Sequence, residues 1–534
     1  MRRLVTLICL LLAVPVLGVL GSWLTLDAQA LATLSHQWRT VLPDYALQSL
    51  LLSLCVAIGV ALVGGATAAA VTLFDFPGRR AFEWALLLPL AMPAYVLAYA
   101  YTDLLQFSGP LQNVLRSATG AEGALWPDVR SLPGAVLLFV LALYPYVYLL
   151  TRTALAERGV QLMEAARLLG AGPLRRVREV ALPLARPALA AGVALALMET
   201  LADYGVGSYF GLNTFATGIY KAWLVLNDRA AAAQLASLLL ALVALLLWLE
   251  RRAQQRLRFA PSRAGPANAA EARALPLAGR SAALAWTLCA LPVLLGFVVP
   301  VGVLLALLAR ESIGSPFGLP LARFADWASA SLRLAALAAL LAVALALALG
   351  FALRAARRGE WLRVAARVVS LGYAVPGAVI AVGILLPVGW VQAQWPGAPL
   401  AGIVTGTAAG LLYAYLVRFS AVALQSVEAG YARLPLSIDE TARMLGAGPA
   451  RLFAELHAPL LKRSAFAAAL LVFVDVMKEL PATLVLRPFD SDTLAVVAYQ
   501  LARDERLGEA ALPSLAIVLV GLLPVVLLSR ALRK

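Results

Sequence analysis

The stretch EAARLLGAGP at residues 164–173 returns 276 positions later as ETARMLGAGP at residues 440–449. The first copy continues to Leu182-Pro183 and the second to Ala458-Pro459, and both copies lie between strongly apolar segments. A polar, basic element that occurs twice in an otherwise apolar chain indicates a duplicated protein with one such element in each half.

The composition is that of a membrane protein. Of the 534 residues, 62% are hydrophobic and 14% are charged, whereas soluble domains are about 45–50% apolar and about 25% charged. Apolar runs of about 20 residues recur along the chain, and such runs cross a bilayer as helices. The sequence therefore predicts an all-α polytopic protein in a lipid bilayer. The net charge of +15 resides in short loops between spans, which indicates membrane topology and not a nucleic-acid partner.

Residues that would support catalysis or metal binding are not grouped in the sequence. Cys9, Cys55 and Cys289 lie in apolar runs without a CxxC pair, so we predict no disulfide and no tightly bound metal. No lysine follows a glycine, and a phosphate-binding GK[ST] loop is therefore absent. The chain is predicted not to be an enzyme, and if ATP drives it, the ATPase is a separate chain.

About twelve spans are expected, in two sets of six. Arginine-rich loops alternate with poorer loops, so the positive-inside rule places both termini in the cytoplasm. The first apolar run follows Arg2 and Arg3 and is longer than a signal-peptide core, so we interpret it as a retained span. The expected spans are 4–24, 46–73, 82–105, 134–151, 188–210, 230–249, 281–309, 329–353, 366–388, 400–425, 465–486 and 511–529.

The repeat divides the chain into a first half, 1–250, a linker, 251–280, and a second half, 281–534. The linker is rich in Arg, Pro, Gly and Ala, as flexible connections are. Each half has a proline-marked span, then the polar element (152–187 or 426–464), then a span that contains charges. Because corresponding elements occupy the same place among six helices, the repeats are predicted to be parallel.

Each polar element is predicted to be a helix, a sharp turn and a second helix. In the first copy, residues 164–169 are good helix formers, and Gly170-Ala171-Gly172-Pro173 ends that helix. Glycine adopts the left-handed conformation that ends helices, and proline suits the first turn of the next helix. Residues 174–182 then form a basic amphipathic helix that joins the following span at Pro183.

The two elements resemble the EAA motif of ATP-binding-cassette importer permeases. The matching positions are Glu164, Ala165, Ala166, Gly170 and Pro183 in the first copy, and Glu440, Ala442, Gly446 and Pro459 in the second, where Thr441 replaces the first alanine. The resemblance implies that both elements couple the chain to a cytoplasmic ATPase, present in two copies. That partner would use ATP and Mg²⁺, and this chain would bind no cofactor.

Three longer segments, 199–223, 415–430 and 478–515, resemble the fused, two-half permeases of ferric-iron importers. The resemblance implies a type I-like permease of the bacterial inner membrane, with a periplasmic ferric-iron-binding protein that docks on its outer face. Importers of thiamine, polyamines, phosphonate and oxyanions share this architecture. Thiamine or another small cation therefore remains an alternative cargo.

Charged residues occur inside the spans that follow the two elements. They are Glu199 and Asp203 in the first half and Asp475, Lys478 and Glu479 in the second. Such groups are costly in a membrane unless they face a partner or a wet pathway. A spacing of four predicts that each carboxylate pair shares one helix face, which would suit a cation pathway. The other interpretation is a set of structural ion pairs near a helix end.

Two further features leave alternatives open. The charged loop from Arg487 to Glu509 is a candidate docking surface for the periplasmic protein, or an ordinary solvated loop.

A secondary transporter would need no ATPase but leaves the two elements unexplained, and a membrane scaffold does not account for the paired charges.

Overall fold

The computed structural model describes residues 2–25, 28–255, 274–314, 319–355, 360–489 and 491–532. Nearly all regular structure in these ranges is helical, and two short strands, β1 (Phe74–Asp75) and β2 (Leu275–Pro276), pair in parallel. The predicted all-α polytopic fold is confirmed. Residues 256–273, which form most of the predicted linker, lie outside the described residues.

Ten helices in the described ranges are long and apolar enough to cross a membrane, and one bent pair would make an eleventh. The expected eleventh span, 465–486, falls on α22 (Ala458–Met477) and α23 (Pro481–Leu486) and is not among them. The helix α22 contains three charged residues, Lys462, Arg463 and Asp475. The ten are Leu7–Leu24, Leu42–Leu73, Leu132–Ala156, Val177–Ala202, Arg229–Arg252, Arg280–Gly314, Leu321–Ala355, Gly377–Gln394, Ala408–Tyr431 and Leu507–Leu527.

Both proline-marked spans are interrupted, although the sequence predicts one helix for each. A short 3-10 turn precedes Pro93 in the first half and Pro376 in the second, and each proline adopts an extended ψ of 142° before a new helix begins. The first break bends the segments Arg79–Ala91 and Ala94–Thr119 by 91°. The residue before a proline is disfavoured in the α conformation, which accounts for both breaks.

The helix α3 (Leu42–Leu73) shows how the spanning helices divide their surfaces. Leu47, Leu54 and Leu62 are exposed, whereas Leu52, Val56 and Val60 are buried. Positions three or four apart share a face of a helix, so one apolar face packs inside the protein and the other apolar face is left for lipid.

The described chain forms two compact units, and each takes segments from both sequence halves. Unit 1 consists of Met1–Trp38, Gly218–Leu240 and Pro320–Val497, and unit 2 consists of Arg39–Thr217, Ala241–Leu319 and Ala498–Lys534. The predicted bounds and parallel orientation of the sequence repeats stay a prediction, whereas these units are a division of the fold. Four unit boundaries fall within helices, namely α2 (Ala28–Arg39), α11 (Phe215–Tyr220), α12 (Arg229–Gln255) and α24 (Leu494–Arg503). The fifth lies between Leu319 and Pro320, outside any helix.

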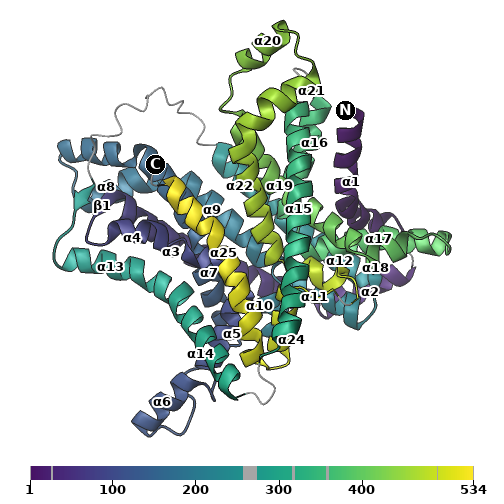
Figure 1. The fold of residues 1–534 in the computed structure, drawn as a ribbon. Helices are drawn as coiled ribbons and strands as arrows, with labels where there is room; N and C mark the ends of the chain where they lie inside the picture. Colours follow the sequence, from purple (N-terminus) through teal and green to yellow (C-terminus); the bar gives the residue numbers. More distant parts are fainter. Residues whose placement is uncertain are drawn as a thin grey trace. The chain divides into compact units, whose positions relative to one another are not determined.

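In unit 1, α15, α19 and α22 pack side by side, and α20 extends beyond them (Figure 1). The N-terminal helix α1 packs against α16 and α17. The helices of the unit, besides α22 and α23, are α1 (Arg2–Gly21), η1 (Ser22–Thr25), η4 (Lys221–Val225), α15 (Leu321–Ala355), α16 (Glu360–Leu371), η7 (Gly372–Ala374), α17 (Gly377–Gln394), α18 (Leu400–Gly406), α19 (Ala408–Tyr431), α20 (Leu436–Met444), α21 (Pro449–Arg451) and η8 (Leu452–His457).

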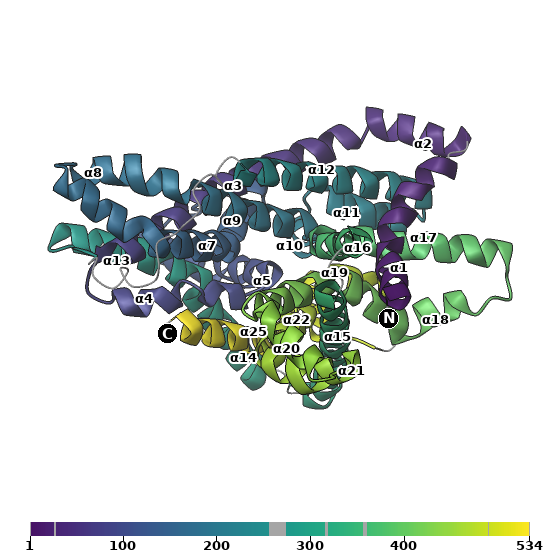
Figure 2. The ribbon, with the colours of Figure 1, turned by 90° about the horizontal axis from the view of Figure 1, so that it is seen from above.

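In unit 2, α3, α7 and α9 form the central packing, and α8 lies at the far end of α7 and α9 (Figure 2). The helix α14, from the second half of the sequence, packs against α5 and α25. The helices of the unit, besides α3, are α4 (Arg79–Ala85), η2 (Leu88–Ala91), α5 (Ala94–Leu105), α6 (Pro110–Thr119), α7 (Leu132–Leu168), α8 (Pro173–Arg176), η3 (Val177–Ala181), α9 (Leu182–Ala202), α10 (Gly205–Tyr209), α13 (Arg280–Val293), η6 (Leu294–Val298), α14 (Val299–Gly314) and α25 (Leu507–Leu532).

Two glycines allow these three helices to approach closely. A Cβ on Gly64 of α3 would lie 2.7 Å from the Tyr144 carbonyl oxygen, and one on Gly192 of α9 would lie 2.6 Å from the Val147 Cα, both in α7. Helices in membranes associate through small residues of this kind, because lipid offers no hydrophobic drive for their contact. The packing fixes α7 and α9, which carry the first polar element between them.

Candidate functional site

The first polar element folds as the predicted helix, turn and helix. The helix α7 ends at Leu168, and Gly170 takes a left-handed φ of 80°. The Ala171 amide donates to the Ala166 carbonyl at 3.0 Å, and the Gly170 amide donates to the Arg167 carbonyl at 3.0 Å. These bonds satisfy carbonyls that a helix end otherwise leaves open. The chain then continues through α8 and the π-helix η3 into α9, with Pro183 in the first turn of α9.

The backbone of the second polar element forms the same turn with the same hydrogen bonds. The helix α20 ends at Met444, and Gly446 has a φ of 83°. The Ala447 amide donates to the Ala442 carbonyl at 3.0 Å, and the Gly446 amide donates to the Arg443 carbonyl at 3.0 Å. The chain continues through α21 and the π-helix η8 into α22, where Pro459 lies in the first turn.

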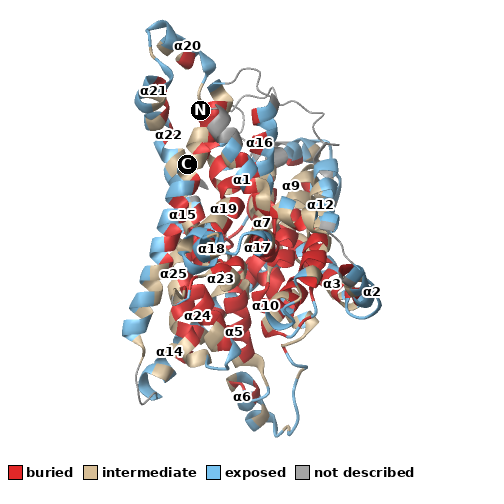
Figure 3. Cartoon of the chain, turned by 90° about the vertical axis from the view of Figure 1, so that its right-hand side faces the viewer, coloured by how far each residue is buried: buried red, intermediate tan, exposed pale blue. Residues whose placement is uncertain are grey.

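Each turn presents two apolar side chains to solvent. Leu168 and Leu169 are 85% and 88% exposed, and Met444 and Leu445 are 82% and 79% exposed. An exposed apolar pair therefore lies at the same place in each turn. Figure 3 shows α20 as a largely exposed projection. The helix ends at Leu168, so Leu169 follows it and is exposed, while Met163 is buried.

The motif residues lie close to these turns. Glu164 and Glu440 are exposed, as are Ala165 and Thr441, whereas Ala166 and Ala442 are half-buried. The Thr441 hydroxyl donates back to the Ser437 carbonyl at 2.9 Å, so the replacement of alanine by threonine is accommodated within the helix.

The second helices of the elements also match. Arg175 pairs with Glu179 at 2.8 Å in the first, and Arg451 pairs with Glu455 at 2.8 Å in the second. The hydrogen bond to the neighbouring glutamate raises the pKa of both arginines. Both pairs are exposed, where ion pairs contribute little to stability, so they leave each element with a polar, mixed-charge surface.

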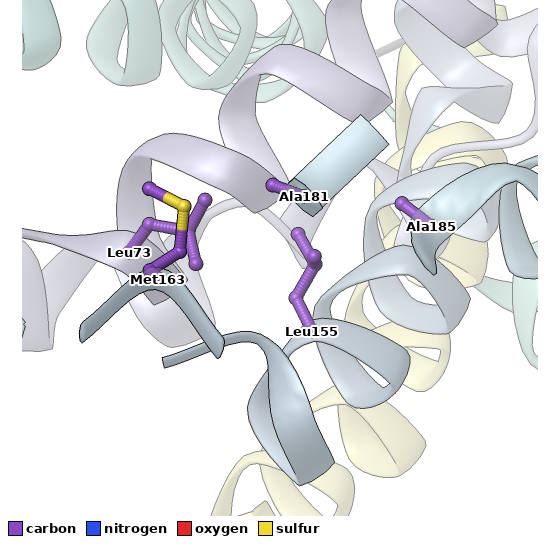
Figure 4. Close-up of a cluster of buried hydrophobic side chains, with 5 residues drawn as sticks. All are labelled: Leu73, Leu155, Met163, Ala181 and Ala185. Carbon is purple, nitrogen blue, oxygen red and sulfur yellow. The ribbon is translucent and has the colours of Figure 1, made fainter. Parts of the chain in front are cut away.

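An apolar cluster supports the first element. It consists of Leu73, Leu155, Met163, Ala181 and Ala185, all buried (Figure 4). Met163 precedes Glu164 in α7, and Ala181 ends η3. The cluster therefore joins the two arms of the element to each other and to the end of α3.

A polar network supports the second element. Arg354, near the end of α15, donates to both carboxylate oxygens of Asp439, at 2.7 and 2.9 Å, and the side chains of both residues are less than 10% exposed. His457 Nε2 lies 3.2 Å from Asp439 Oδ1. Burial raises the pKa of Asp439, but the hydrogen bonds with Arg354 and His457 outweigh it and hold that pKa below its usual value.

The charged residues of the spans do not share helix faces as predicted. The helix α9 ends at Ala202 and α22 ends at Met477, so Asp203 and Glu479 follow the helices and do not belong to them. Asp203 Oδ1 accepts from the Val206 amide at 2.8 Å, and Glu479 Oε1 accepts from the Ala482 amide at 2.9 Å. Each carboxylate thus caps the short helix that follows it, α10 or α23. Gly205 and Pro481, two residues farther on, are the sequence signals for these breaks.

The other carboxylate contacts include ion pairs. Arg418 lies 3.3 Å from Glu479, and both side chains are buried; Lys478 lies 3.4 Å from Asp475, and both are about one-quarter exposed. Glu199 is half-buried in the last turn of α9. Their part in a pathway stays a prediction. Among the described residues, no group of three or more His, Cys, Asp or Glu side chains could hold a metal ion.

Ion pairs also occur along the charged segment 487–509. Arg487 pairs with Asp492, and Arg506 pairs with Glu509 at 2.6 Å. Burial lowers the pKa of Arg487. Asp490 lies outside the described residues, and the docking role of this segment stays a prediction.

Comparison with known proteins identifies the family. The family described as "Binding-protein-dependent transport system inner membrane component" matches residues 61–259 and again residues 345–534. Each match contains one polar element, so the predicted duplication is confirmed.

Several curated relatives are similar to this chain. The Fe(3+)-transport system permease protein FbpB 2 of Haemophilus influenzae is 26% identical over 487 residues, which cover 90% of this chain and 88% of that protein. The putative 2-aminoethylphosphonate transport system permease protein PhnU of Salmonella choleraesuis is 28% identical over 36% of this chain and 68% of its own length. The molybdenum transport system permease protein ModB of Escherichia coli is 28% identical over 41% of this chain and 96% of its own length.

The family match, the helical membrane fold and the duplicated domain all support one assignment. The chain belongs to the binding-protein-dependent transport system inner membrane components, as a multi-pass importer permease of the ATP-binding-cassette class that carries the family domain twice.

Proposed function

We propose that this chain is the permease subunit of an ATP-driven importer of ferric iron, and that its two polar elements dock on a separate ATPase. The observation that carries the proposal is the repeated turn, in which the same backbone hydrogen bonds present an exposed apolar pair in each copy. Hereafter the two polar elements are called the first and second coupling elements. In this proposal two ATPase copies use ATP and Mg²⁺, one at each element.

The connections of the elements suit the transmission of force. In the first element, α7 belongs to the span Leu132–Ala156 and runs on to Leu168, while η3 continues into α9. Burial of apolar side chains contributes about 25 cal/mol per Å² removed from water, so Leu168 and Leu169 would provide affinity for an apolar cleft on the ATPase. A displacement of the turn would then move the cytoplasmic ends of both helices together.

Ferric iron is favoured as the cargo because FbpB 2 resembles this chain across both halves, whereas PhnU and ModB match less than half of it. A periplasmic ferric-iron-binding protein would deliver the ion to the outer face, and both termini would lie in the cytoplasm. Thiamine or another small cation is the alternative cargo. A secondary transporter is disfavoured, because a transporter of that class has no ATPase subunit to which the two exposed turns could bind.

The charged residues of the spans remain candidates for weak contacts with the cargo during passage. They are Glu199, Asp203, Asp475, Lys478 and Glu479. The cap formed by Glu479 and its contact with Arg418 favour a structural role for that residue. Because an importer needs only transient contacts with its cargo, tight metal binding by this chain is not expected.

The proposal is tested by uptake of radiolabelled ferric iron in a host that lacks its own iron importers and expresses this chain with its ATPase and binding protein. The double variant Glu164→Ala/Glu440→Ala is expected to insert normally but to lose ATP-dependent uptake. The matched control is Glu179→Ala/Glu455→Ala, which removes exposed carboxylates from the second helices of the same elements. Normal uptake by the first double variant would overturn the coupling role. Absence of iron uptake by the assembled wild-type complex would overturn the cargo and leave the family membership intact.

A further inference from the structure

The supports beneath the two coupling elements are chemically different at matching positions. With the 276-residue offset that aligns Glu164 with Glu440, Leu155 corresponds to Tyr431, Met163 to Asp439 and Ala181 to His457. The first three belong to the buried apolar cluster, whereas Tyr431, Asp439 and His457 belong to the buried polar network. Outside these positions the turns themselves have the same hydrogen bonds.

The helix that leads into the turn also differs. In the first element α7 is continuous from Leu132 to Leu168. In the second element α19 ends at Tyr431, residues 432–435 form a turn, and α20 begins at Leu436 after Pro435. Proline lacks the amide that a continuous helix requires. The second element is therefore a separate short helix that needs another means of attachment to the spanning bundle.

Arg354 supplies that attachment. Its guanidinium donates to the carbonyls of Tyr431 at 3.2 Å, Leu434 at 3.0 Å and Pro435 at 3.0 Å, in addition to its two bonds with the Asp439 carboxylate. All five N–H donors of the arginine are thus used. Three of the bonds hold the turn between α19 and α20, and two hold α20 itself. A bidentate arginine–carboxylate pair fixes direction as well as distance.

His457 connects the same carboxylate to the second arm of the element. It ends η8 and is 1% exposed, with its ring edge-on to Phe351 of α15. Because the Asp439 carboxylate can only accept, Nε2 carries the hydrogen, and in the neutral ring Nδ1 accepts from the Tyr431 hydroxyl at 3.3 Å. Asp439 therefore joins α15, α20 and η8 in one buried network.

We propose that Arg354, Asp439 and His457 are positioning residues that set the angle of the second coupling element, and that the two coupling elements are therefore not equivalent. This inference rests on the proposed coupling function. The first element is an extension of a spanning helix, and its position follows from apolar packing. The second is a hinged helix, and its position depends on a single buried carboxylate.

The test measures each element separately in the full complex. After Cys9, Cys55 and Cys289 are replaced by alanine, a photo-crosslinker is attached at Leu168→Cys or at the corresponding Met444→Cys, and cross-linking to the ATPase is measured. Asp439→Asn is expected to reduce cross-linking from Met444→Cys by about fivefold or more, the scale of a lost charge-assisted hydrogen bond. Cross-linking from Leu168→Cys is expected to stay unchanged, as is cross-linking from both sites in the control Met163→Leu, at the position matching Asp439.

A second variant separates positioning from folding. Replacement of a buried ion pair by apolar residues of similar volume is often neutral for stability, so Arg354→Met/Asp439→Met is expected to remain folded while it releases the three turn carbonyls. Its ratio of transported iron to hydrolysed ATP is expected to fall, with cross-linking lost only at the second element.

The outcomes distinguish the two proposals. If neither site cross-links to the ATPase in the otherwise wild-type complex, the proposed coupling function fails. If both sites cross-link and Asp439→Asn leaves the second site unchanged, or lowers both sites equally, the positioning role fails while the coupling function stands.

Discussion

At the scale of single residues, corresponding carboxylates in the two halves have related structural roles. Asp203 and Glu479 each accept an amide hydrogen bond at the start of a short helix, and the carboxylate of Glu479 also lies 3.3 Å from the buried Arg418. A buried charge that loses its counter-ion is costly in a low dielectric. Glu479 is therefore expected to matter for stability, whether or not cargo passes it.

Replacement of Glu479 by glutamine tests this. The amide keeps an acceptor for the cap but removes the charge that faces Arg418, so we expect a loss of about 3–5 kcal/mol in the free energy of unfolding. Thermal unfolding of the detergent-solubilised protein measures it. The control is Asp475→Asn, whose pair with Lys478 is partly exposed and should contribute less than about 1 kcal/mol. Equal losses for both variants would contradict the assignment of Glu479 as the more strongly coupled carboxylate.

At the scale of elements, the turn of each coupling element depends on a left-handed glycine. A Cβ at Gly170 or Gly446 would meet no atom within 4 Å, so a substitution there acts through backbone conformation and not through a clash. The left-handed conformation costs a residue with a Cβ about 1–2 kcal/mol, and asparagine pays less of this cost than other residues.

Gly170→Val is therefore expected to open the turn, and Gly170→Asn is expected to preserve it. Trypsin cleavage after the exposed Arg167 measures the opening, because a protease requires a locally unfolded segment. The valine variant should be cleaved several times faster than the asparagine variant, and Gly446 should behave in the same way at Arg443. Equal cleavage of the two variants would show that the turn does not need the left-handed conformation.

The turn of each coupling element can be predicted from the sequence, but the support of the second element cannot. Glycine and proline at 170–173 predict the turn, because their backbone preferences are local. The support of the second element could not be predicted in this way. Asp439 lies in a polar helix beside Glu440 and resembles a solvated residue, and its partners Arg354 and His457 are 85 and 18 positions away. The carboxylate pairs do not share one helix, as the spacing of four predicts, because α9 and α22 end at Ala202 and Met477, shortly before Gly205 and Pro481.

At the scale of the whole molecule, neither compact unit is built from one half of the sequence. Unit 1 needs α1 from the first half and residues 320–497 from the second, and unit 2 needs α14 and α25 from the second half. Duplication in the sequence therefore does not produce two independently folding domains. The hydropathy pattern predicts the spans but does not indicate which spans pack together.

Expression of residues 1–255 and 274–534 as two separate chains tests this arrangement. Each half alone is expected to be degraded or to aggregate, because it lacks helices that its compact unit requires. Together the halves are expected to co-purify and to restore uptake, since all the described helices of both units are then present. A single half that is monodisperse and resists proteolysis as well as the full chain would contradict the prediction.

The packing of α1 against α16 and α17 has a consequence for biosynthesis. Proteins are synthesised at about 5–20 residues per second, and α1 is complete some 340 residues before α16 begins. Helix α1 is therefore present in the bilayer for tens of seconds before α16 and α17 have been synthesised. During that interval its Gly18, which later lies against Gly383, is open to any other membrane helix with a small-residue surface. Correct insertion therefore requires that the second half be synthesised before α1 associates with a helix of another membrane protein.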